Sequence, residues 1–124
     1  MLSPDGSSVA LAERVNDENI FKVISLADGS VIGNYPSAKG TANVVCLAWS
    51  QDGRSLAYIL ADEAENTHTL WFQPLSQQKP RLVADLHEEQ IYELSGFALS
   101  PDGKSFALLQ GSWNHNAVLI NGLK

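Results

Sequence analysis

The chain has 124 residues, of which 44% are hydrophobic, which suits one domain with enough apolar residues to fill a core. Eight basic and fourteen acidic residues give a formal net charge of -6, and no run of like charge is longer than Glu88-Glu89. A protein that binds a phosphate backbone needs a basic stripe, so the composition argues against nucleic acid as a partner. No apolar run approaches the roughly 18 to 20 residues of a membrane span, and we recognise no signal peptide before Leu2.

One turn sequence occurs three times. The copies are Ser3-Pro4-Asp5-Gly6, Ser50-Gln51-Asp52-Gly53 and Ser100-Pro101-Asp102-Gly103, followed by Ser8-Val9-Ala10-Leu11, Ser55-Leu56-Ala57-Tyr58 and Ser105-Phe106-Ala107-Leu108. Proline presets φ at the first central position of a tight turn, aspartate bonds nearby backbone N–H groups, and glycine accepts a positive φ. The repeat therefore predicts three β-hairpins. Apolar residues follow one another directly in 44–49 and 56–60, which indicates a hairpin covered on both faces.

In chain order, the first repeat unit should begin with the end of a strand at residues 1–3. Strands are then expected at 9–12, 20–26 and 31–35, separated by a polar loop at 13–19 and a turn at 27–30. Asp28-Gly29 in that turn is a typical hairpin dipeptide. A connection rich in small residues, 36–43, leads to the next unit.

The second and third units follow the same course. The second has expected strands at 44–49, 56–60, 69–75 and 81–86, an acidic loop at 61–67, a turn at 76–80 and a link at 87–90. The third has expected strands at 92–99, 106–110 and 117–123, with a loop at 111–116. No segment shows a sustained helical period.

These elements define repeat units of about 1–42, 43–90 and 91–124 within one domain, with successive turns 47 and 50 residues apart. Four short antiparallel strands in a repeat of about 40 to 50 residues are typical of a β-propeller blade. We therefore expect an all-β fold: a partial β-propeller of about three four-stranded antiparallel blades, with a ring that is not closed within this chain.

The segments 47–57 and 97–107, which carry the second and third turns, resemble the WD40-like, TolB-type propeller repeat of bacteria. The stretch from Gln90 to Ile120 is similar to the C-terminal end of propellers appended to bacterial serine/threonine kinases and winged-helix regulators. Related repeats also form the gating propellers of prolyl-oligopeptidase-like peptidases. The resemblance implies a structural turn without functional residues, and a periplasmic or other extracytoplasmic location as one option.

A propeller ring closes when its last blade meets its first, so this chain should leave blade faces and sheet edges uncovered. The expected partner is a protein or the remaining blades of a longer propeller, and homo-oligomerisation is the alternative. The start within a strand favours the longer propeller.

No group of residues in the sequence predicts a catalytic or metal-binding site. His68, His87 and His115 lack the paired spacing of a zinc site, so we interpret them as solvated loop residues. The acidic residues of the 61–67 loop do not follow a calcium-loop pattern, and a solvated loop is the simpler interpretation; they are Asp62, Glu63 and Glu65.

The remaining candidates also favour structural roles. Cys46 lies in an apolar strand and should pack in the core. The serines that follow the turn glycines are repeated turn residues, not nucleophiles on a strand-to-helix elbow. Trp113-Asn114-His115 is an aromatic cluster that would cap a blade. We therefore predict no catalytic, cofactor-binding or metal-binding residue and no cofactor, leave the binding residues unassigned, and expect a non-catalytic scaffold or, alternatively, a gating propeller.

Overall fold

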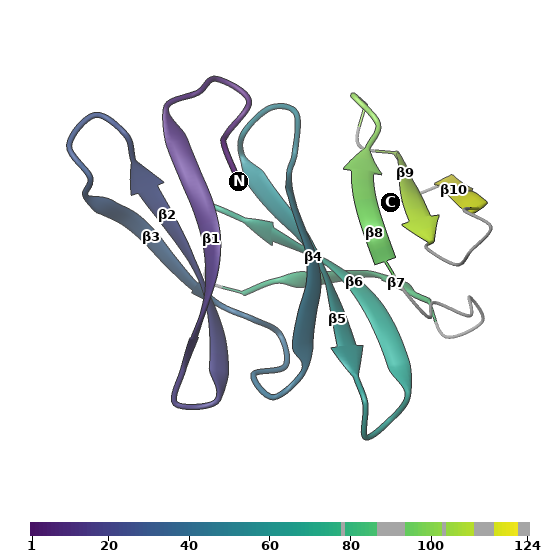
Figure 1. Ribbon diagram of the computed structural model, residues 1–124. Helices are drawn as coiled ribbons and strands as arrows, with labels where there is room; N and C mark the ends of the chain where they lie inside the picture. Colours follow the sequence, from purple (N-terminus) through teal and green to yellow (C-terminus); the bar gives the residue numbers. More distant parts are fainter. Residues whose placement is uncertain (78, 87–93, 103, 111–115, 122–124) are drawn as a thin grey trace.

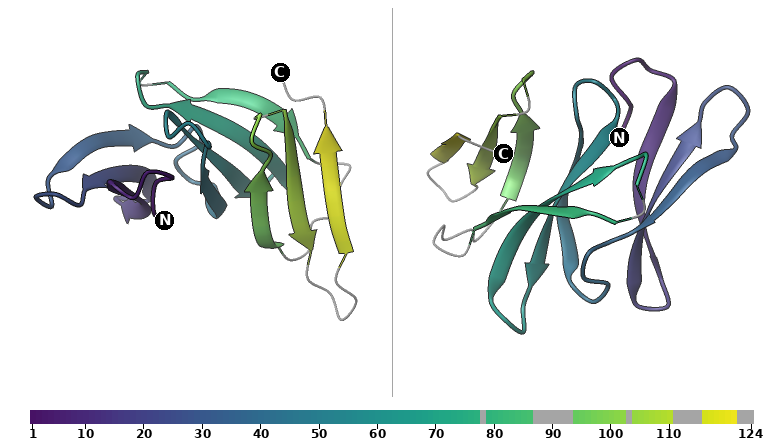
Figure 2. Two further views of the ribbon diagram at one scale, coloured as in Figure 1. Left: turned by 90° about the horizontal axis from the view of Figure 1, so that it is seen from above. Right: turned by 180° about the vertical axis from the view of Figure 1, so that it is seen from behind.

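The computed structural model describes residues 1–77, 79–86, 94–102, 104–110 and 116–121. These residues form three antiparallel sheets and no helix, and the sheets fan out side by side (Figures 1 and 2). Blade 1 contains β1 (Ser8–Val15), β2 (Glu18–Ser25) and β3 (Val31–Pro36). Blade 2 contains β4 (Asn43–Trp49), β5 (Ser55–Asp62), β6 (Thr67–Pro74) and β7 (Arg81–Asp85). Blade 3 contains β8 (Leu94–Leu99), β9 (Ser105–Gln110) and β10 (Asn116–Asn121).

This arrangement confirms the partial β-propeller. Strands pair with their neighbours in sequence within each sheet, and the described residues do not close a ring. Blade 2 has all four strands. In blade 1 the innermost position is held by residues 1–3, since Leu2 forms an antiparallel bridge with Val9 and the Ala10 N–H donates to the Met1 carbonyl at 2.8 Å. The Trp49 indole N–H also donates to that carbonyl, at 3.0 Å, which ties this segment to blade 2.

The prediction of a polar loop at 13–19 is wrong. β1 continues to Val15 and β2 starts at Glu18, joined by Asn16 (φ 50°) and Asp17 (φ 64°). Two successive positive φ values define a tight hairpin turn whose twist matches that of its strands, and Asn and Asp tolerate this conformation. The loop expected at 61–67 is likewise shorter, because β5 runs to Asp62 and β6 begins at Thr67. The hairpin tips lie in solvent, so the strand ends next to them are rich in polar residues. The prediction therefore assigned these strand ends to loops.

The interface between blades 1 and 2 forms the first core. Phe21 and Tyr58 are fully buried with ring centroids 4.4 Å apart, a contact worth about 0.5–1.5 kcal/mol beyond area burial. Ala10 and Val23 lie in the same cluster, facing Leu56 of blade 2. Both large and small side chains of blade 1 thus pack against large side chains of blade 2.

The second core lies between blades 2 and 3. Ala57 and Ile59 of β5 pack with Phe106 and Leu108 of β9. All five residues from Leu56 to Leu60 are at most 1% exposed, and alternate ones belong to different cores. The structure therefore confirms that this strand is covered on both faces.

Hydrogen bonds also join blade 1 and the connection that follows it to blade 2. The Tyr35 hydroxyl donates to the Leu75 carbonyl at 2.9 Å, and the Ala38 N–H donates to the Tyr58 hydroxyl at 3.1 Å. Burial raises the pKa of Tyr58 to about 12. The Asn19 amide donates to the Ala42 carbonyl, so the buried asparagine holds the connection between the blades.

Candidate functional site

The three repeated turns share one hydrogen-bond pattern. In the second copy, the Ser50 hydroxyl donates to Asp52 Oδ1 at 2.6 Å and accepts from the Ser55 N–H at 3.0 Å. The Arg54 N–H donates to the same carboxylate oxygen at 2.9 Å, and Gly53 has φ 70°. In the first copy, the Ser3 hydroxyl donates to Asp5 (2.7 Å) and accepts from the Ser8 N–H (3.0 Å), and the Ser7 N–H donates to Asp5 (2.9 Å). In the third copy, the Ser100 hydroxyl donates to Asp102 (2.5 Å) and accepts from the Ser105 N–H (3.0 Å), and the Lys104 N–H donates to Asp102 (3.0 Å). The sequence places the leading serine in all three copies of the turn but assigns it no hydrogen-bonding role, which the structure supplies.

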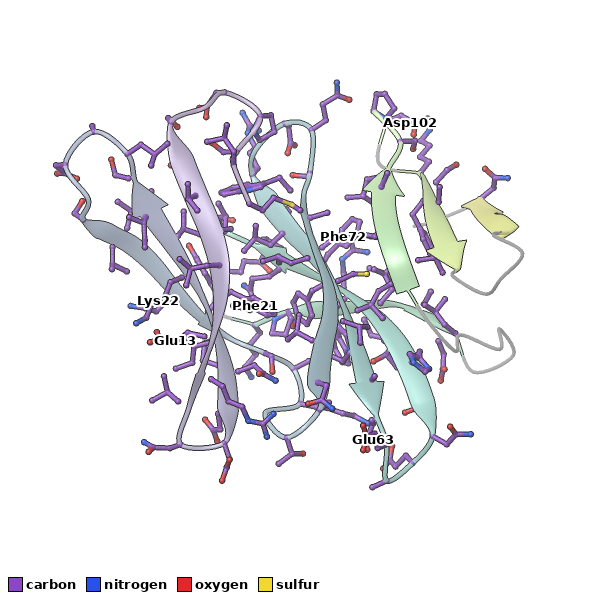
Figure 3. The ribbon with its side chains drawn as sticks, viewed as in Figure 1. Glu13, Phe21, Lys22, Glu63, Phe72 and Asp102 are labelled. Atoms are coloured by element: carbon purple, nitrogen blue, oxygen red, sulfur yellow. The ribbon has the colours of Figure 1, made fainter. Side chains whose placement is uncertain are left out.

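A fourth turn of similar design joins β2 to β3. The Ser30 N–H donates to Asp28 Oδ1 at 2.9 Å, and Gly29 has φ 74°. All four turns lie along the upper rim in Figure 1, which we call the turn face. Figure 3 shows Asp102 on this rim and Glu63 at the opposite end of the molecule. The turn face therefore carries four aspartates, one from each turn.

Each of these aspartates is held in its charged form. The Ser7 N–H and the Ser3 hydroxyl lower the pKa of Asp5 to about 2. The Ser50 hydroxyl and the Arg54 N–H lower the pKa of Asp52, and the same kinds of bond lower the pKa values of Asp28 and Asp102. A carboxylate that accepts several hydrogen bonds is favoured in its ionised state. The turn face is therefore negatively charged at these positions at neutral pH.

Grooves lie between successive repeated turns. The first, of about 230 Å³, separates the first two turns, with Asp5 and Asp52 beside an apolar surface of Ile32, Trp49 and Leu75. The second, of about 110 Å³, separates the second and third turns and is lined by Asp52, Phe72, Leu99, Pro101 and Asp102 among others. Pockets for small ligands usually measure about 300–1,000 Å³. These grooves suit a single inserted side chain instead.

The histidine and acidic-loop interpretations have mixed outcomes. His68 lies half-buried in β6, where burial lowers its pKa, so it is not the solvated loop residue that we expected. Lys39 Nζ approaches Glu65 at 3.0 Å and Asp62 at 3.7 Å, so the acidic turn after β5 is partly neutralised by a cation from the connection between the blades. In the described ranges, no three His, Cys, Asp or Glu side chains lie where they could hold a metal ion. His87 and His115 fall outside those ranges.

The other candidates occupy structural positions. Cys46 is half-buried beside the core between blades 2 and 3, and burial raises the pKa of its thiol. The Ser105 hydroxyl donates to Asn121 at 2.7 Å, across β9 and β10. Trp113-Asn114-His115 and the 87–90 link lie outside the described residues. The described part of the chain contains no helix with the length and apolar character needed to cross a membrane.

Replacing Asp52 by alanine should lower the free energy of unfolding by about 0.5–1.5 kcal/mol, because the change removes the shared acceptor of the second turn. Urea denaturation followed by circular dichroism measures the loss. Gln51→Ala, in the same turn, is the matched control and should change stability by less than about 0.5 kcal/mol. Equal effects of the two substitutions would contradict the role that we assign to the aspartate.

The stability of the chain should fall in acid as the turn aspartates are protonated. The pKa of Asp5 drops from an ordinary value of 3.8 to about 2 on folding, so its contribution is complete above 3.8 and is lost as the pH falls towards 2. Urea midpoints measured between about pH 5 and pH 2 test this prediction. Asp5→Asn should reduce the slope in that window, and an unchanged slope would contradict it.

Comparisons with known proteins show the fold. No protein-family model matches the sequence, and a search of curated proteins finds no match. Among solved structures, hydrazine synthase of Kuenenia stuttgartiensis aligns with a TM-score of 0.68 and 18% identity over 97% of this chain and 37% of that one. TolB from Acinetobacter baumannii aligns with a TM-score of 0.60 and 17% identity over 94% and 29%. The β-propeller domain of the trilobed protease from Pyrococcus furiosus, described as having an open velcro topology, aligns with a TM-score of 0.57 and 13% identity over 93% and 35%.

The arrangement of the sheets defines the class of protein: a partial β-propeller. The similar solved structures include TolB and the propeller domain of the trilobed protease, so the fold is TolB-like. The chain spans about a third of the length of each of these three structures. At this level of identity the likeness concerns architecture alone, and propellers host many unrelated functions.

Proposed function

We propose that this chain is a non-catalytic β-propeller scaffold that binds a protein partner across the turn face. The observation that carries the proposal is the groove between the first two turns, where carboxylates stand beside an apolar wall. Asp5 and Asp52 would attract a cation, and Trp49 and Ile32 would pack against an aliphatic stem. Lysine and arginine combine these two properties in one side chain, and a cation can also lie over an indole ring.

The same preference for a basic side chain recurs at the next groove along the turn face. The second groove also has aspartates at its rim and aromatic and aliphatic residues in its wall, namely Phe72 and Leu99. Successive grooves would therefore receive successive basic side chains of one partner segment. Arg54 and Lys104, which follow the second and third turns, would limit binding at their own positions by like-charge repulsion.

The turn chemistry supports a binding role over catalysis. The described serines of the turns bond to aspartates or to backbone N–H groups, and His68, the one histidine within the described ranges, lies in β6 and not on the turn face. A nucleophilic serine needs an adjacent base. We propose that the attached part of a longer protein would be a kinase or a winged-helix regulator, on the resemblance of residues 90–120.

A peptide-binding measurement tests the scaffold proposal. Twelve-residue peptides from a random library would be selected on the immobilised chain, synthesised, and titrated against it by calorimetry. We expect selected peptides to be rich in lysine and arginine, and to bind Asp5→Asn/Asp52→Asn at least about tenfold more weakly. Glu63→Gln, at the opposite end, removes the same kind of charge and should leave binding unchanged. Equal affinity for all variants, or hydrolase or kinase activity in the chain alone, would overturn the proposal.

The alternative function is an accessory propeller that controls substrate entry to a serine peptidase. Its support is the fold similarity to the propeller domain of the trilobed protease. A hydrolase domain with a Gly-x-Ser-x-Gly elbow in the same polypeptide would favour this function. A kinase or winged-helix domain in that position would favour the scaffold.

A further inference from the structure

The residue after the turn glycine differs from blade to blade, although the rest of the repeated turn is nearly the same. It is Ser7 in blade 1, Arg54 in blade 2 and Lys104 in blade 3, and each of these residues is exposed. The Ser7 hydroxyl donates to Asp5 Oδ1 at 2.7 Å and adds no charge. The first turn is therefore negatively charged, whereas a cation accompanies the aspartate in the second and third turns.

A second turn in blades 1 and 2 shows the same difference. In blade 1, the turn after β2 carries Asp28, and the Ser30 hydroxyl donates to Asp28 Oδ1 at 2.6 Å. In blade 2, residues 75–80 follow β6, contain no acidic residue and include the exposed Lys79. The two turns of blade 1 therefore hold two aspartates and no basic residue, while those of blade 2 hold one aspartate and two basic residues.

Backbone hydrogen bonds hold the two turns of a blade side by side. In blade 1, the Leu26 N–H donates to the Ser7 carbonyl at 2.9 Å, so the Asp28 turn starts beside the first repeated turn. In blade 2, the Leu75 N–H donates to the Arg54 carbonyl at 2.9 Å in the same way. The charges of the two turns are therefore brought together within each blade.

Charged residues of blades 1 and 2 thus divide the turn face into two regions. We call Asp5 with Asp28 the negative region, and Arg54 with Lys79 the positive region. The lining of the first groove includes Asp5 and Asp52 but no basic residue. Within the described part of the chain, all hydrogen bonds to these two carboxylates end on Oδ1, so each Oδ2 is left to accept from a partner. A basic side chain in this groove would contact two carboxylates and no cation.

The second groove is less suited to a basic side chain. The Ser100 hydroxyl, then the Lys104 N–H and finally the positive charge of Lys104 lower the pKa of Asp102. By contrast, the pKa of Asp5 is lowered by hydrogen bonds alone, the first of them from the Ser7 N–H. The first groove is also larger, about 230 Å³ against about 110 Å³. It is therefore the stronger of the two sites for a long basic side chain.

We propose that the partner segment on the turn face is bipolar, with a basic side chain in the first groove and an acidic side chain paired with Arg54 and Lys79. This arrangement rests on the proposed function and adds to it which charges the segment carries and where they bind. A segment with basic residues only would bring like charges together at the positive region, which disfavours such a partner. The residue after the turn glycine would therefore set which charge each blade accepts.

The repeat itself supplies the variants that test this assignment. Ser7→Arg gives the first turn the residue of the second, and Arg54→Ser makes the reverse change. Both positions keep the backbone N–H that donates to the turn aspartate, so the turns should remain intact. Circular dichroism checks folding. If Ser7→Arg does not fold, Ser30→Arg adds a cation to the other turn of the negative region.

The probe is the tightest of the twelve-residue peptides selected on the wild-type chain, titrated by calorimetry at low ionic strength. We expect it to contain both basic and acidic residues, and to bind Ser7→Arg at least about tenfold more weakly because of like-charge repulsion. A derivative with glutamine in place of its acidic residues should bind the wild type about threefold more weakly, since exposed ion pairs each contribute little.

The positive region is tested by removing its two cations. The peptide and its glutamine derivative should bind Arg54→Ser/Lys79→Ser with equal affinity, because the partner of the acidic residues is gone. Arg14→Ser is the control, since Arg14 lies near the end of β1 that is remote from the turn face. This variant should keep the difference between the two peptides.

The outcomes separate the bipolar segment from the proposed function. Selected peptides without acidic residues would overturn the bipolar segment, and so would equal binding of the peptide and its glutamine derivative to the wild type. Unchanged affinity in Ser7→Arg would overturn it as well. In each of these cases the scaffold proposal would stand as long as Asp5→Asn/Asp52→Asn weakened binding. If that double variant bound as tightly as the wild type, both proposals would fail together.

Discussion

Tyr58→Ala should lower the free energy of unfolding by about 3–5 kcal/mol, the usual cost of removing a large buried aromatic ring. Tyr58 is fully buried, packs against Phe21 with ring centroids 4.4 Å apart, and accepts a hydrogen bond from the Ala38 N–H. The substitution therefore leaves a cavity between two blades and removes a polar tie at the same place. Because small domains are stable by only about 5–15 kcal/mol, the variant should be close to unfolding at room temperature.

Urea denaturation of Tyr58→Ala and Tyr58→Phe separates the two contributions. The phenylalanine keeps the ring and removes only the acceptor for Ala38, so we expect it to cost about 1 kcal/mol. A loss below about 1 kcal/mol for the alanine variant would show that blade 1 does not depend on this contact. Intrinsic fluorescence provides a second probe, because Trp49 and Trp71 both pack against the same core.

Gln73→Glu should lower the free energy of unfolding by about 3 kcal/mol or more at neutral pH. Gln73 is fully buried on β6, and its amide N–H groups donate to the carbonyls of Pro74 (2.9 Å) and Gln77 (2.6 Å). A carboxylate at this position would face two carbonyl oxygens without a donor. An uncompensated buried charge is among the most destabilising changes in a protein core.

The loss in Gln73→Glu should depend on pH in a defined direction. Burial would raise the pKa of the introduced carboxyl above its unfolded value of about 4.3, so the folded variant binds a proton that the unfolded chain releases. Its stability relative to the wild type should therefore be greatest below about pH 4 and decrease as the pH rises through the folded pKa. Gln73→Met, similar in size and neutral, should show a smaller loss with no such pH dependence. A flat profile for Gln73→Glu would mean that water reaches this site.

The repeated turns show how far local sequence can predict structure. Proline, aspartate and glycine at fixed positions have preferences that hold wherever the chain places them, so the hairpins could be located without tertiary information. The hydrogen bonds of Ser50 with Asp52 and Ser55 confirm the turn and give its first serine a role that the sequence interpretation did not assign. Polar strand ends such as 13–15 could not be recognised in the same way. Their strand conformation depends on pairing with β2 and not on burial.

The candidate site could not be predicted from the sequence. The groove between the first two turns joins Asp5, Ile32 and Asp52, which are 20 to 47 residues apart in the chain. Nothing in the local pattern around any of them indicates a binding surface, because each has an ordinary role in its own hairpin. The site exists only because adjacent blades bring equivalent turns side by side on one rim.

By itself, the sequence determined the strand-rich units, their turns and the all-β class, because turn chemistry and apolar runs act over a few residues. Tertiary structure alone decided which face of each strand meets which blade. Val9 and Leu56 occupy equivalent places in the repeat, yet only Leu56 is fully buried. The physical reason is that burial depends on the neighbouring sheet: the same residue position becomes core or surface according to whether another blade covers it.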